Sequence, residues 1–369
     1  MSTVSRSTSS SAQDDAMEGG LTFLTTKQLW RSSARSAIRS AWQADDHAGA
    51  WAAWTAHLEE RSAPAAPLLR AKGKRPTPLA WGLPAGAGAD FAKWLGKEVD
   101  CSSVADSADR WIAEAGDRPA DLRFALEAIA WAAALPSLAT TVEPEVWWPL
   151  ADTLRRLARE ASATAAPPAS DAEATVVEQL LAGELPLLLG RLLPEMQPMH
   201  DLAGDARDTL SGGIERLTDG EGVLTSKLHA DPAMPAASLL LACWTRCGAL
   251  VGKGKPPWSA DAQLQYEWLV RQTLRVADRW GRPAFTPADT AGLDDLLRKA
   301  IELAADESDL AAAGRRLKGF KADDSFEAPA ASNHSEWSEA GVLAAGWRDK
   351  APRIVVAHPG TCKPVLSLS

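Results

Sequence analysis

An excess of helix-forming residues is the feature that most constrains how this chain can fold. Alanine, the residue with the highest helix propensity, supplies about a fifth of the 369 positions. Aromatic residues, which favour strands, make up only 6% of the sequence, and they consist of 16 Trp, 6 Phe and 1 Tyr. We therefore expect an all-α protein, and an all-β fold or a Rossmann-type parallel sheet is excluded.

Apolar residues recur at helical spacing in one segment after another, with proline and glycine between the segments. The clearest segments are Lys27–Glu60, which divides near Asp45–Gly49, and then Pro119–Ala134, Pro149–Glu160, Asp171–Leu185, Pro198–Leu217 and Ala260–Trp280. Pro136 is expected to end the helix over 119–134, and Ser259 is expected to cap the helix that follows it. Roughly ten helices joined by short loops favour stacked helical hairpins, arranged as an incomplete α/α toroid.

The two ends of the sequence differ from this helical middle. Residues 1–20 are polar, small and aperiodic, which is typical of a disordered leader. Residues 21–327 hold the helices, and residues 328–369 form a short tail with strand-like runs at Gly341–Trp347 and Arg353–Ala357. Because two short strands do not make a stable sheet, we expect them to pair on the helical body or to begin a β domain that this chain lacks.

Charge, cysteine content and hydropathy exclude several classes of protein. A formal charge of −9 argues against a nucleic-acid partner, which would need a basic surface. No apolar stretch is long enough to span a bilayer, and the N-terminus has no secretory signal, so we expect a cytoplasmic protein without a membrane partner. Four cysteines in a chain of this length do not predict a disulfide framework. No cofactor is predicted, and the oligomeric state stays open.

The single tyrosine, Tyr266, is the strongest candidate for chemistry. A phenol can act as general acid or base if a nearby cation lowers its pKa, and Arg246, Arg271 and Arg275 are the candidate cations. The alternative, which we favour, is that Tyr266 fills a helix interface with its hydroxyl on a partner. Among the six histidines His229 is the best candidate, in a loop before a capped helix, although an exposed loop imidazole is the commoner case.

No metal site is predicted from the spacing of possible ligands. The histidines and cysteines form neither His-x-x-x-His nor Cys-x-x-Cys patterns. Cys243 and Cys247 lie one turn apart on an apolar helix face, where buried thiols are common. A metal would need a third and a fourth ligand, and none is near these cysteines in the sequence.

Two basic loops stand out against the acidic background, and each comes just before a tryptophan. Lysine beside an exposed indole is suited to an anionic sugar, because the charge pairs with a carboxylate or sulfate while the ring stacks on the pyranose. The alternative for either loop is a solvated loop with the tryptophan packed beneath it. The candidate residues are Lys72 and Lys74 before Trp81, and Lys253 and Lys255 before Trp258. Most of the other tryptophans fall on apolar helix faces and are expected to fill the core.

One stretch of the sequence resembles a known family. The segments Asp219–Gly222, Leu240–Arg246 and Tyr266–Arg271, together with Trp258, are similar to the helical part of heparinase-like and alginate lyase-like polysaccharide lyases. The resemblance implies an α/α toroid followed by a β-sandwich, and β-elimination at a uronic acid. It implies that Tyr266 would move the proton and that His229 would neutralise the carboxylate, with no β-sandwich present to complete the site.

Two functions follow, and they belong to different classes. In the first, the chain is a non-catalytic or degenerate toroid that acts as a binding or interaction protein related to polysaccharide lyases, with acidic oligosaccharide as a candidate ligand. In the second, it is a uronic-acid polysaccharide lyase, with Tyr266, His229 and Arg246 as the catalytic residues. We favour the first, because half of the site that the resemblance implies is missing.

Overall fold

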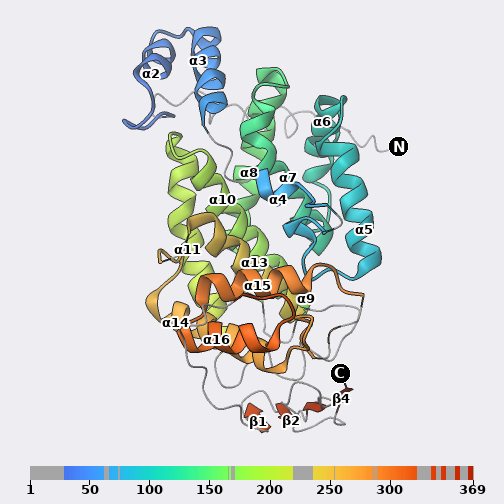
Figure 1. Ribbon diagram of the computed structural model, residues 1–369. Coiled ribbons are helices and arrows are strands. Elements are labelled where there is room, and N and C mark those ends of the chain that lie inside the picture. The colour runs from blue at the N-terminus through green and yellow to red at the C-terminus, as the bar shows by residue number, and fades with distance from the viewer. Residues whose placement is uncertain are drawn as a thin grey trace, which may run out of the picture.

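The chain forms a body of helices with a small sheet at its C-terminal end (Figure 1). The computed structural model describes residues 29–61, 66–73, 75–164, 166–167, 171–218, 236–252, 254–284, 286 and 289–321, together with four strands between residues 334 and 368. The first helices are α2 (Ser36–Gln43), α3 (His47–Glu60), α4 (Ala66–Leu69), α5 (Ala85–Trp94), α6 (Val104–Ala115), α7 (Leu122–Leu138), α8 (Pro144–Ala163) and α9 (Ala172–Glu178). The later ones are α10 (Leu185–Leu192), α11 (Gln197–Thr218), α13 (Ala236–Val251), α14 (Ala260–Val276), α15 (Leu293–Ala304) and α16 (Glu307–Arg316). Between them lie the 3₁₀ segment η1 (Pro78–Ala80) and the π-helical segments η2 (Leu95–Val99) and η3 (Gln179–Glu184).

The all-α class with a short β segment at its C-terminal end is confirmed. Helices that follow one another pack together, as α2 does with α3, α10 with α11, and α14 with α15. Contacts between more distant elements join α7 to α10, α11 to α14, and α13 to α15. Among the residues that the structure describes, no helix is both long and apolar enough to cross a membrane.

Contacts between helices do not test the predicted domain boundaries or the predicted toroid. The expected leader at residues 1–20 lies outside the described residues. The expected boundary between residues 327 and 328, and the closure of the helices into an incomplete toroid, stay predictions. Figure 1 shows α2 and α3 at one end of the helical body, with α14, α15, α16 and the strands toward the other end.

Helix α7 lies in the core because nearly all of its surface is apolar. Every residue from Phe124 to Pro136 is buried, and many of them are alanines whose small side chains let neighbouring helices approach closely. The one acid in this stretch, Glu127, accepts hydrogen bonds from Arg118 at 2.6 Å and from Arg123 at 2.7 Å. Glu127 therefore has the charged partners that a buried carboxylate needs.

Two expectations about prolines are wrong. The sequence predicts that Pro136 ends a helix, yet α7 continues through it to Leu138. The sequence also predicts a helix start at Pro149, yet α8 begins at Pro144 and includes Pro149. Each proline removes a backbone hydrogen bond from its helix. Packing of these helices against their neighbours, with Leu150 and most of α7 buried, offsets that loss.

A group of tryptophans fastens α2 and α3 to α8. The Trp30 ring centroid lies 4.9 Å from that of Trp54, and the Trp147 centroid lies 4.8 Å from that of Trp148. The Trp147 indole also donates to the carbonyl oxygen of Leu135 on α7 at 2.8 Å. Such ring pairs contribute about 0.5–1.5 kcal/mol each beyond the area they bury. The group comprises Trp30, Trp42, Trp51, Trp54, Trp147 and Trp148.

The four strands form an antiparallel sheet in the order β1 (His334–Trp337), β2 (Val342–Ala345), β3 (Ile354–Ala357) and β4 (Val365–Leu368). The two strand-like runs expected from the sequence correspond to β2 and β3, and these strands pair with each other. The structure adds β1 and β4. The sequence analysis missed β1 because most of its residues are polar, and it missed β4 because its mostly apolar run is only four residues long. Successive residues alternate in exposure, since Ile354 is exposed and Val355 is buried.

Gly190 provides a test of the close approach between α10 and α11. A Cβ atom at Gly190 would lie 2.9 Å from the carbonyl oxygen of Met199 and 2.8 Å from the Cβ of Ala203. We expect Gly190→Ala to lower the free energy of unfolding by about 1–3 kcal/mol in urea denaturation, because the two helices must move apart. The matched control is Gly204→Ala on the exposed face of α11, where a Cβ meets nothing within 4 Å. The control should raise stability by about 0.5–1 kcal/mol, and equal effects of the two substitutions would contradict the prediction.

Candidate functional site

The structure describes most of the predicted site residues, and it places them in two different environments. His229, Lys74 and Lys253 lie outside the described residues, so their predicted roles stay predictions. Lys72 and Lys255 are exposed, as expected for loop cations. The remaining candidates are buried in the helical body: Arg246, Tyr266, Trp81 and Trp258.

Tyr266 lies in a helix interface, in agreement with the packing role. Its side chain on α14 is only 1% exposed, and its hydroxyl is 3.0 Å from the Thr245 hydroxyl on α13. Its ring lies 5.1 Å from the Trp258 ring, centroid to centroid. Burial raises the pKa of Tyr266 well above its ordinary value, and the hydrogen bond between its hydroxyl and that of Thr245 opposes that shift. A phenol held in this way is a poor proton acceptor at neutral pH.

The arginines expected to lower the pKa of Tyr266 have other partners, so that expectation is wrong. Arg246 is 3% exposed and binds both carboxylate oxygens of Glu184 at 2.7 Å. Arg271 pairs with two carboxylates that flank the start of α16. Arg275 lies 3.4 Å from the side-chain oxygen of Gln272. The geometry therefore gives Arg246 a structural partner in place of a substrate.

Trp81 and Trp258 are not exposed platforms, which corrects a second expectation. Trp81 is buried beside Gly292, where a Cβ atom would clash with the Cδ1 atom of the indole. Trp258 is buried, and its Nε1 atom donates to Gln263 at 2.9 Å. The burial of both rings agrees with the alternative interpretation, in which the tryptophan is not exposed.

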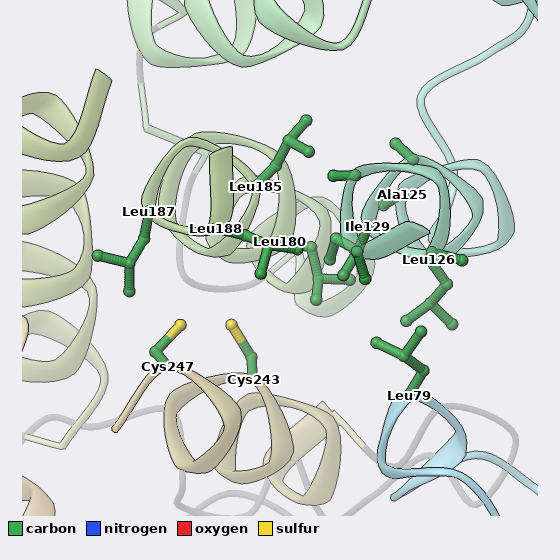
Figure 2. Packing of buried hydrophobic residues seen from close by; sticks show 14 of the residues in the cluster. Leu79, Ala125, Leu126, Ile129, Leu180, Leu185, Leu187, Leu188, Cys243 and Cys247 are labelled. Carbon is green, nitrogen blue, oxygen red and sulfur yellow. The ribbon is translucent and has the colours of Figure 1, made fainter. Parts of the chain in front are cut away.

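Helix α13 meets the π-helical segment η3 inside the core. Trp244 Nε1 donates to the side-chain oxygen of Gln179 at 3.0 Å, and the Cys243 thiol donates to the backbone oxygen of Gln179 at 3.5 Å. Figure 2 shows the sulfur atoms of Cys243 and Cys247 next to each other, both directed toward the helix that carries Leu187. Burial raises the pKa of both thiols, so they are neutral in this environment. π-Helical turns occur often at functional sites.

The structure also contains an exposed tryptophan with two cationic side chains close to its ring. The sequence analysis did not identify this tryptophan as a candidate. Trp280, in the turn after α14, is 43% exposed. The Lys318 ammonium lies 4.2 Å from the centroid of this ring, and the Arg279 guanidinium lies 5.0 Å from it. Arg298 on α15 joins the group by donating to the carbonyl oxygen of Lys318. We name these residues, Trp280, Arg279, Arg298 and Lys318, the Trp280 cluster.

Backbone contacts hold the Trp280 cluster together. The Lys318 amide donates to the carbonyl oxygen of Arg279 at 2.8 Å, which fastens the end of α16 to the turn. The Asp278 carboxylate accepts from the amides of Trp280 and Arg282 at 2.8 and 3.0 Å. Gly281 has a φ of 82° and faces the backbone of Asp294, so this turn requires glycine. These contacts fix the backbone positions from which the ring of Trp280 and its neighbouring cations extend.

The charge of the Trp280 cluster is available to a ligand. Among the described residues, no ion pair within 4 Å involves Arg279, Arg298 or Lys318. By contrast, a pocket of about 260 Å³ between α6, α7 and α8 contains Arg118 and Arg156, which already pair with Glu127 and Asp152. A flat aromatic ring beside unpaired cations is suited to a ligand with an apolar face and negative charge.

The members of the Trp280 cluster are far apart in the sequence, which explains why the sequence analysis did not identify it. Lys318 and Arg298 come from elements that follow Trp280 much later in the chain. Only Arg279 is adjacent to the ring in sequence, and a single Arg-Trp pair carries little information. The sequence feature that could have indicated this cluster is the excess of basic over acidic residues in the short turns around Trp280 and Lys318.

Because the chain has a single tyrosine, the burial of Tyr266 can be measured without interference from another phenol. We expect no tyrosinate absorbance from the folded protein at a pH near 10, where an exposed phenol is half ionised. Above that pH the folded state binds more protons than the unfolded state, so its stability falls as the pH rises. An ultraviolet titration followed together with circular dichroism tests both points, and Tyr266→Phe supplies the baseline. Ionisation near pH 10 while the helices stay intact would contradict the burial of this phenol.

Comparisons with known proteins add no relative. No family model, curated protein or solved structure matches this chain. The resemblance to polysaccharide lyases therefore stays a prediction from the residues, and any function has to be argued from the geometry of the site.

Proposed function

We propose that this chain is a non-catalytic helical binding protein, related in fold to polysaccharide lyases, and that it binds acidic oligosaccharide through the Trp280 cluster. The observation that carries the proposal is the half-exposed indole of Trp280, with Lys318 and Arg279 against its ring. The indole supplies a flat apolar surface for a pyranose ring. The unpaired cations supply partners for its carboxylate or sulfate groups.

The residues suited to elimination chemistry support a binding role over a catalytic one. A lyase of the kind considered above needs a base that reaches the substrate, and Tyr266 has its hydroxyl on Thr245 in a buried interface. It also needs a group that neutralises the substrate carboxylate, and the residue predicted for this role, His229, lies outside the described residues. Arg246, the third predicted catalytic residue, already donates to Glu184 and to the carbonyl oxygen of Pro78. The described part of the chain thus gives better support to binding than to turnover.

The binding role predicts a specific effect of Trp280. We expect Trp280→Ala to weaken the binding of an oligouronate from alginate by about tenfold, because one indole face contributes about 1–2 kcal/mol of apolar contact. Lys318→Gln should weaken binding several-fold and reduce its dependence on salt. Isothermal titration calorimetry measures both effects. Lys93→Gln, an exposed lysine on α5 outside the cluster, is the matched charge control and should bind like the wild type.

The ligand series provides the result that would contradict binding at this place. A neutral oligosaccharide of the same length should bind more weakly than the oligouronate, because it offers nothing to the cations. Equal affinity for both ligands would contradict recognition of an acidic sugar. An unchanged affinity of Trp280→Ala for the oligouronate would show that the binding surface lies elsewhere.

The absence of turnover is a separate prediction. We expect no increase in the ultraviolet absorbance of unsaturated uronates when the protein is incubated with alginate or glycosaminoglycans, because the Tyr266 phenol is inaccessible. A protein-dependent increase that Tyr266→Phe abolishes would overturn the non-catalytic role and favour the lyase. An increase that survives Tyr266→Phe would show catalysis without this residue, and would overturn the non-catalytic role as well.

A further inference from the structure

Three side chains with metal-binding atoms meet in the core, away from the Trp280 cluster. The Sγ atoms of Cys243 and Cys247 and a carboxylate oxygen of Glu184 all lie within 4.8 Å of one another, and all three residues are buried. Two of these atoms come from one face of α13, since positions i and i+4 of a helix lie one above the other. The third comes from the end of η3, which packs against α13. The tertiary structure thus supplies the third ligand that the sequence did not place near the cysteines.

We propose that Cys243, Cys247 and Glu184 form a binding site for a zinc ion. Two thiolates bound tetrahedrally to zinc, at about 2.3 Å each, lie about 3.8 Å from one another. The donor atoms therefore need only a small contraction from their present separations to surround the ion. Thiolate sulfur together with a carboxylate oxygen is a donor set that zinc accepts and that magnesium and calcium do not favour.

The net charge of the residues at this site would be cancelled by a divalent zinc ion. Two thiolates and the Glu184 carboxylate carry three negative charges, and Arg246 beside Glu184 carries one positive charge. The sum of −2 equals the charge that a divalent cation neutralises, so the loaded site is neutral within an apolar core. On binding, each cysteine releases its thiol proton to solvent and donates an electron pair to the ion, with no change in oxidation state.

The surroundings of Glu184 hold it in position for this role. Arg246 donates to both carboxylate oxygens at 2.7 Å and leaves each oxygen with a further lone pair. Metal-ligating carboxylates are commonly oriented by such hydrogen bonds. The backbone oxygen of Gln179, which lies 3.5 Å from the Cys243 sulfur, is a further oxygen beside the three side-chain donors.

The test compares zinc binding by the full chain and by two cysteine variants. Protein is incubated with excess zinc and a phosphine reductant, desalted, and its metal content is measured by inductively coupled plasma mass spectrometry. We expect the wild type to retain a stoichiometric amount of zinc and Cys243→Ala/Cys247→Ala to lose it. A buried cysteine packs as a small apolar residue, so alanine should keep the helices intact, which circular dichroism checks. Cys101→Ala is the matched control, and it should retain zinc like the wild type because Cys101 lies outside this cluster.

A second measurement keeps the proposal falsifiable if the double variant fails to fold. Cadmium added to the wild type should displace zinc and produce the ultraviolet charge-transfer band of a thiolate–cadmium bond. Zinc should also raise the melting temperature of the wild type, because it binds the folded state. A wild type that retains no zinc, a double variant that retains as much as the wild type, or cadmium binding without the thiolate band would each overturn the proposal.

Discussion

The buried ion pair between Arg246 and Glu184 is the interaction on which the organisation of the core depends. A charge inside an apolar core is tolerated only with a partner, and removal of one member of such a pair costs about 3–5 kcal/mol. The pair therefore holds α13 against η3 in one position, and a further bond from Arg246 to the carbonyl oxygen of Pro78 brings in η1. Thr245, the neighbour of Arg246, extends the same polar layer to Tyr266 on α14.

This arrangement places several reactive side chains in the core. Tyr266, Cys243 and Arg246 are each saturated by partners from adjacent helices, so none of them meets solvent. Their chemistry is then suited to holding the fold, or to binding an ion within it. The Trp280 cluster differs, because its cations lie at the surface without an ion-pair partner among the described residues, and this is why we assign the proposed binding role to it.

The tryptophans show how one residue type serves two purposes. Trp54, Trp131, Trp147 and Trp244 are completely buried and fill the space that small alanine side chains leave between helices. Their positions on apolar helix faces made this packing role predictable from the sequence. Trp280 differs because it lies in the turn after α14 and stays 43% exposed. A local pattern of cations before a tryptophan did not separate these cases, since exposure depends on what the rest of the chain covers.

The sequence by itself determined the helical class, most helices, the Ser259 cap and strands β2 and β3, because backbone propensity, side-chain period and capping chemistry are local properties. It misjudged Pro136 and Pro149, where the burial of whole helices outweighs the loss of single hydrogen bonds. Only the tertiary structure decided which cations are paired and which rings are exposed. It alone brought Glu184 to Cys243 and Cys247, and Lys318 to Trp280. These groups are distant in sequence, and they meet only because the packing of helices fixes their positions in space.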